Sequence, residues 1–143
     1  MEEYDIRQEY KDEGGETIYN HREYNIKDEN NDYILRLEID EKNINIIISL
    51  NDIIEYNYKT KMNLSTIVNK LELNPIKYSN LELILNIFDE IYKNNNIFIK
   101  INNDESCILI IKFINVLKEE TYEIKLYKNI LILKINLICY LIK

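Results

Sequence analysis

Apolar and polar residues alternate along two neighbouring stretches of the chain, residues 33–39 and residues 44–50. Strict alternation is typical of a strand with one buried face, because successive side chains point to opposite sides of a sheet. The polar residues 40–43 lie between the two stretches and predict a turn, so we expect the strands to form a hairpin. Residues 54–61 alternate less regularly and predict a third, weaker strand.

The spacing of apolar residues then changes to that of a helix. Residues 64–71 carry apolar side chains three and four positions apart, and Asn63 is a suitable N-cap for them. A clearer stripe of the same spacing runs through residues 81–92 and ends at a run of three asparagines. Ser79 and Glu82 are three positions apart, which is the pattern of a capping box. Two consecutive helices are therefore expected in the middle of the chain.

Strand patterns return after the helices. Residues 97–101 and 121–127 alternate, while residues 107–114 are apolar on both faces, which favours a central strand. The order is three strands, two helices and three strands. Strands that are separated from helices in this way indicate an α+β fold. We expect a mostly antiparallel sheet of about six strands with the two central helices packed on one face.

An apolar C-terminal segment of 13 residues, residues 130–142, follows the last predicted strand. It is shorter than the roughly 20 residues that a membrane-spanning helix needs, and Lys134 and Asn136 interrupt it. Three interpretations stay open. The segment is a last core strand or helix, a segment that docks on a partner or a membrane surface, or a truncated gene end.

The order of elements across residues 33–127 resembles that of the globular heads of coiled-coil scaffold proteins, such as those of centriole assembly. Those heads also place a helical pair between two groups of strands. The resemblance is one of order alone, since no sequence motif accompanies it and no long heptad helix follows residue 127 in this sequence. It implies no site residues, and we do not assign the family from it.

Composition and charge set the first 32 residues apart. Ile occurs 29 times and Asn 21 times among 143 residues, and Ala is absent, which is the bias of a very AT-rich genome. Residues 1–32 hold 11 acidic and 4 basic residues, whereas residues 33–143 hold 14 of each, so the net charge of −7 lies in the first segment. We predict an acidic, disordered tail over residues 1–32, a globular domain over residues 33–129, and the apolar segment over residues 130–143.

Few residues of the chain suit catalysis or cofactor binding. The single histidine, His21, falls in the predicted tail, and no glycine occurs after residue 32, which excludes phosphate-binding loops of the P-loop and dinucleotide classes. Asp28, Asn30 and Asp32 match the first ligand positions of a calcium loop, but the glycine and the final glutamate of that loop are absent. We therefore predict no catalytic residues, no metal site and no cofactor.

The net charge and the positions of the cysteines indicate which binding partners and which cellular compartment to expect. An acidic chain repels phosphate backbones, so no nucleic-acid partner is expected. Cys107 and Cys139 lie in apolar runs and are read as buried thiols, and the polar N-terminus is unlike a signal peptide. We expect an intracellular protein, located in the cytoplasm and not associated with membranes.

The leading hypothesis is a non-enzymatic protein–protein interaction or scaffold domain, with an unidentified protein partner and with homo-oligomerisation left open. Tyrosine is frequent at interfaces, because it joins a large apolar ring to a polar hydroxyl. The expected interaction surface comprises Tyr56, Tyr58, Tyr122, Leu137 and Tyr140. Two alternatives remain: a small enzyme or enzyme subunit with an unrecognised acid/base site, and a peripheral membrane protein that attaches through residues 130–142.

Overall fold

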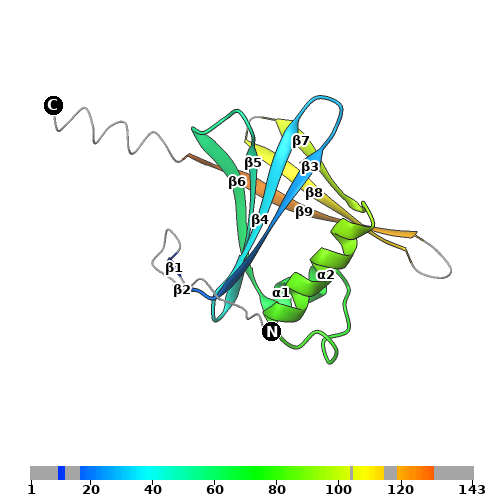
Figure 1. Cartoon of the computed structure of the whole chain (residues 1–143). Coiled ribbons are helices and arrows are strands. Elements are labelled where there is room, and N and C mark those ends of the chain that lie inside the picture. The colour runs from blue at the N-terminus through cyan, green and yellow to red at the C-terminus, as the bar shows by residue number, and fades with distance from the viewer. Residues whose placement is uncertain (1–9, 12–16, 104, 115–118, 131–143) are drawn as a thin grey trace, which may run out of the picture.

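The computed structural model describes residues 10–11, 17–103, 105–114 and 119–130. Within these ranges the chain forms nine strands and two helices (Figure 1). The strands are β1 (Tyr10–Lys11), β2 (Thr17–Ile18), β3 (Asn20–Lys27), β4 (Asp32–Ile39), β5 (Asn43–Leu50), β6 (Tyr56–Asn63), β7 (Ile97–Asn103), β8 (Ser106–Ile114) and β9 (Glu119–Ile130). The helices are α1 (Leu64–Lys70) and α2 (Leu81–Lys93).

Seven strands make one antiparallel sheet in the order β3-β4-β5-β6-β9-β8-β7, while β1 and β2 pair separately. Strands β3 to β6 form one meander and β7 to β9 form a second one. The two meanders join where β6 pairs with β9, from Tyr56 opposite Ile130 to Lys59 opposite Tyr127. This architecture confirms a sheet-rich α+β fold with a mostly antiparallel sheet and two helices.

The sheet curls into a half-barrel, so its two edge strands, β3 and β7, come into contact with each other (Figure 1). Helix α2 contacts β3, β4 and β8, which belong to opposite ends of the sheet, and α1 contacts β6 and β9. The predicted strand number and helix packing are therefore wrong in detail. The sheet has seven strands, and the helices lie within its curve because a twisted sheet of this width bends around what it buries.

The core lies on the concave face of the curled sheet, between the strands and the two helices. Alternate residues of β4 and β5 point into it, as their sequence pattern predicts, and the buried face of α2 packs against them. Phe88 of α2 is fully buried at the centre of this face. The alternation predicted over residues 121–127 is also confirmed, with Ile124 and Leu126 buried and Tyr122 partly buried.

The structure has the N-cap that the sequence predicts for α1, but it lacks the capping box predicted for α2. The side chain of Asn63 accepts a hydrogen bond from the Thr66 amide at 2.9 Å, so the predicted N-cap of α1 is confirmed. The predicted capping box of α2 is wrong, because Asn80 is the N-cap. Glu82 instead accepts a hydrogen bond from the Asn20 side chain at 2.9 Å and so connects α2 to β3.

Strand β3 lies in the segment that was predicted to be a tail, so that boundary is wrong for residues 17–27. The strand pairs with β4 from Asn20 opposite Ile39 to Lys27 opposite Asp32. Only Tyr24 and Ile26 of β3 are buried, and its other side chains are polar. An edge strand with so few apolar residues resembles a solvated segment in sequence, and its pairing with β4 and its contacts with α2 make it a strand. Residues 131–143 lie outside the described residues, so the three interpretations of the C-terminal segment stay predictions.

Candidate functional site

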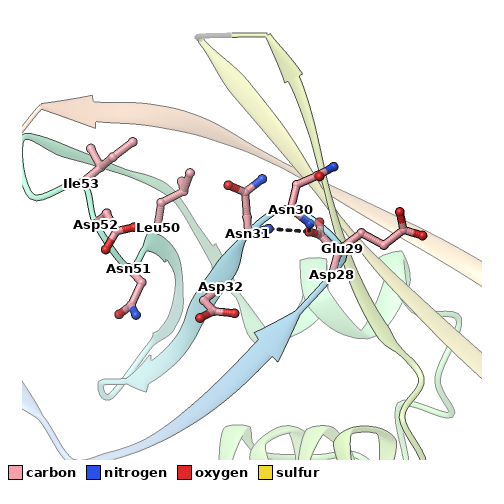
Figure 2. Close-up of a pocket in the computed structure, with 9 residues that line it drawn as sticks. All are labelled: Asp28, Glu29, Asn30, Asn31, Asp32, Leu50, Asn51, Asp52 and Ile53. Atoms are coloured by element: carbon pink, nitrogen blue, oxygen red, sulfur yellow. Dashed lines mark hydrogen bonds between the residues drawn. The ribbon is translucent and has the colours of Figure 1, made fainter.

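A cavity of about 320 Å³ opens where the β3–β4 and β5–β6 turns lie side by side. It is lined by acidic, amide and aliphatic side chains: Asp28, Glu29, Asn30, Asn31, Asp32, Leu50, Asn51, Asp52 and Ile53 (Figure 2). Figure 2 shows the carboxylates of Glu29 and Asp52 at opposite ends of this group. The four carboxylates make this end of the molecule electronegative, but they do not converge on one point.

In the β3–β4 turn, the Asp28 carboxylate of the calcium-loop pattern is hydrogen-bonded to backbone amides. One carboxylate oxygen of Asp28 accepts hydrogen bonds of 2.8 Å from the amides of Asn30 and Asn31. These two bonds keep the pKa of Asp28 below its ordinary value, because they stabilise the ionised carboxylate. Among the described residues, no group of three or more His, Cys, Asp or Glu side chains could hold a metal ion. The Asp28 carboxylate therefore shapes the turn.

A second group of polar side chains connects β3 to α2. Asp89 of α2 accepts a hydrogen bond from the Tyr24 hydroxyl at 2.5 Å and pairs with Arg22 at 3.1 Å. The Tyr92 hydroxyl donates to the Asn25 carbonyl at 2.9 Å, and the rings of Tyr24 and Tyr92 lie 4.7 Å apart. The pKa of the Tyr24 hydroxyl is raised far above its ordinary value. Burial is the largest cause, and the neighbouring Asp89 carboxylate is the second. These contacts connect the edge strand β3 to helix α2, and the Tyr24 hydroxyl stays protonated.

The single histidine lies on the outer face of β3. His21 is opposite Glu38 of β4 in the register of the sheet, and its pKa is lowered, first by burial and then by the nearby Arg36 guanidinium. Arg36 itself forms ion pairs with Glu23 at 2.8 Å and with Glu38 at 2.6 Å. The environment of His21 therefore favours a neutral imidazole within a network of charged side chains.

The structure distributes the five residues of the expected interaction surface over different environments. Tyr58 is 1% exposed and lies in the core, so it offers no contact area to a partner. Tyr56 is partly buried, packs edge-on against Tyr58 with ring centres 5.6 Å apart, and has the Lys128 ammonium 4.3 Å from its ring centre. Leu137 and Tyr140 lie outside the described residues.

Tyr122 is also partly buried, at the far end of β9. Its hydroxyl contacts carboxylate oxygens of Glu120 at 3.2 Å and Glu72 at 3.3 Å, and its ring packs edge-on against Phe113. Burial and these two carboxylates raise the pKa of Tyr122 to about 12. Tyr56 and Tyr122 therefore lie at different ends of the half-barrel. An interaction surface that includes Tyr56 or Tyr122 remains a prediction.

A surface that the sequence did not reveal lies on the outer, convex face of β7, β8 and β9. Register places the outward residues of these strands beside one another: Lys125 is opposite Ile108, Ile108 is opposite Lys100, and Ile110 is opposite Phe98. We call this surface the outer lysine face. It comprises Phe98, Lys100, Lys112, Lys125 and Tyr127, with Ile108 and Ile110 partly buried between them.

Two aromatic rings of the outer lysine face are exposed and each has a lysine above it. Phe98 is 42% exposed and Tyr127 is 56% exposed. The Lys112 ammonium lies 5.0 Å from the centre of the Phe98 ring, and the Lys125 ammonium lies 5.3 Å from that of Tyr127. Both distances are those of cation–π contacts, which hold the lysine side chains close to the rings.

No signal in the linear sequence identifies this surface, because its lysines occur singly and many residues apart. Once the strands are assigned, Lys100 and Lys125 occupy the polar phase of alternating segments, and Lys112 is the one charged residue of the apolar segment 107–114. Antiparallel pairing of these segments then collects the lysines on one side. The pairing register, and with it the position of each lysine relative to the aromatic rings, comes from the structure.

The chain has no match among protein-family models and no match among curated protein sequences. In the part of the chain that the structure describes, neither helix is long and apolar enough to cross a membrane.

Proposed function

We propose that this protein is a non-enzymatic interaction domain that binds another protein through the outer lysine face. The observation that carries the proposal is the exposure of two aromatic rings, Phe98 and Tyr127, on a sheet face whose helices lie on the opposite, concave side. Aromatic side chains that flank aliphatic ones contribute strongly to protein interfaces, because they bury a large apolar area with little loss of conformational entropy.

The composition of the outer lysine face also supports this proposal. Ile108 and Ile110 are only partly buried, so a bound partner would remove further apolar area from water. The lysines at the margin keep the free domain soluble and give the polar rim that protein interfaces have around an apolar centre.

The test is capture of a partner from an extract of the source cells, followed by reconstitution with the purified partner. We compare the unmodified chain with a variant carrying Phe98→Ser and Tyr127→Ser. A matched control carries Ile54→Ser and Ile76→Ser, since these residues are 66% and 87% exposed and lie in loops outside the outer lysine face. Loss of a stoichiometric partner with the first variant and retention with the control supports the proposal. Equal binding by all three proteins refutes it.

A further inference from the structure

We propose that the outer lysine face binds an acidic, extended peptide segment of its partner; this inference rests on the proposed function and names the partner's chemistry. The charge of the face is opposite to that of the whole molecule, which carries −7. Lys100, Lys112 and Lys125 lie on it together with Glu123, opposite Ile110, and Glu119, opposite Ile114, so three lysines face two carboxylates. A local excess of positive charge on a surface favours acidic ligands and orients them.

Register gives the spacing of these charges. Lys100 and Lys125 flank Ile108 from the two neighbouring strands, so their backbones are about 10 Å apart at the usual separation of strands. Lys59 of β6 lies opposite Tyr127, one strand beyond β9. On one side of an extended peptide, carboxylates two or four residues apart are about 7 or 13 Å apart, and these two spacings bracket the separation between the Lys100 and Lys125 backbones, because the chain rises about 3.3 Å per residue.

The aromatic rings define the length of peptide that the face accommodates. Phe98 lies at the level of Ile110, and Tyr127 lies at the level of Ser106, two strands away. Four residues along a strand and two strands across correspond to a diagonal of about 16 Å, or roughly five residues of extended peptide. Apolar residues on the same side of the peptide as the acidic ones would contact the rings and the isoleucines, so the ligand carries both acidic and apolar residues on that side.

A protein segment fits these features better than a nucleic acid does. A phosphate backbone carries dense negative charge, which Glu123 and the net charge of the whole chain oppose. A short segment with a few carboxylates avoids that repulsion.

Fluorescence anisotropy with the full chain tests the inference. The probe is a labelled peptide of about eight residues in which glutamate and phenylalanine or isoleucine take turns at every second position, with serine between them, and its matched control has glutamine in place of each glutamate. We expect the acidic peptide to bind at least tenfold more tightly than the glutamine peptide and to weaken as salt is raised, because screening reduces exposed charge interactions.

Charge-reversal variants locate the binding. Lys100→Glu with Lys125→Glu should weaken binding of the acidic peptide at least tenfold. Lys42→Glu with Lys70→Glu changes the net charge by the same amount at exposed lysines on other elements, and should leave binding within twofold. Equal weakening by both variants would mean that only total charge matters, and would overturn the inference. Tighter binding of a thymidine oligonucleotide or of anionic lipid vesicles through the same lysines would also overturn it.

Measurements with the captured partner separate this inference from the proposed function. If partner binding is lost with Phe98→Ser and Tyr127→Ser but is unchanged by the Lys100→Glu and Lys125→Glu variant, the inference fails while the proposed function stands. If neither variant changes partner binding, the proposed function itself fails.

Discussion

The attachment of β3 to α2 through Asp89 leads to a sharp prediction about stability. One oxygen of the Asp89 carboxylate accepts a hydrogen bond from the Tyr24 hydroxyl, and the other accepts one from the Arg22 guanidinium. Strand β3 is an edge strand that buries little apolar surface besides Tyr24 and Ile26. Its position therefore depends on this carboxylate more than a central strand would, and Asp89→Ala removes both contacts at once.

The expected loss in the free energy of unfolding follows from the two contacts that Asp89→Ala removes. A hydrogen bond to a charged group contributes about 1.5–3 kcal/mol. The Arg22 and Asp89 side chains are 28% and 39% exposed, so solvent screens their ion pair, and we assign it about 0–1 kcal/mol. We expect Asp89→Ala to lower the free energy of unfolding by about 2–3 kcal/mol, which moves a urea midpoint by roughly 1–2 M at usual m-values.

The assay is urea unfolding followed by far-UV circular dichroism, together with hydrogen exchange of the β3 amides. Glu90→Ala is the matched control, because Glu90 is the neighbouring acidic residue and is exposed. A double-mutant cycle with Tyr24→Phe measures the coupling, which should be about 1 kcal/mol or more. The reasoning is refuted if Asp89→Ala and Glu90→Ala shift the midpoint equally, or if the cycle shows no coupling.

Three further perturbations test other parts of the structure. Phe88→Ala should lower the free energy of unfolding in urea by about 3–5 kcal/mol, because it leaves a cavity at the fully buried face of α2. Phe88→Leu should lower it clearly less, and equal losses for the two variants would argue against tight packing around Phe88. Burial raises the pKa of the Cys107 thiol from 9.0 to about 12, so the folded state holds the proton more tightly. The associated stability is complete below pH 9 and falls by up to about 1.4 kcal/mol per pH unit above it, an excess slope that Cys107→Val should remove in a pH series of unfolding curves. Asn63→Ala and Asn80→Ala should each cost about 1 kcal/mol by loss of an N-cap, whereas Asn86→Ala, at an exposed position inside α2, should be neutral or stabilising in the same assay.

The outer lysine face illustrates how tertiary structure assembles a site from ordinary sequence. Lys100, Lys112 and Lys125 belong to three separate strands and are 12 and 13 positions apart in the sequence. The five residues chosen from tyrosine frequency and C-terminal hydrophobicity include Tyr58, which the structure buries. Residue type alone could not distinguish an exposed tyrosine from a core one, because the two faces of a strand differ only in phase.

Local interactions made the central elements of this protein predictable from sequence. The alternation in β4, β5 and β9 and the stripe of α2 reflect burial of one face, which each segment encodes by itself. The N-cap at Asn63 and the asparagine run that ends α2 at Asn94 are equally local.

Long-range contacts decided the features that the sequence did not predict, which are strand β3, the curl of the sheet and the outer lysine face. Strand β3 exists because β4 supplies its hydrogen bonds and α2 covers Tyr24 and pairs with Arg22, and none of these partners lies within its own sequence. The curl of the sheet and the pairing of β6 with β9 decide which polar side chains meet on the convex face. Pattern determines which side of a strand is buried, whereas only register and strand order determine which exposed side chains become neighbours.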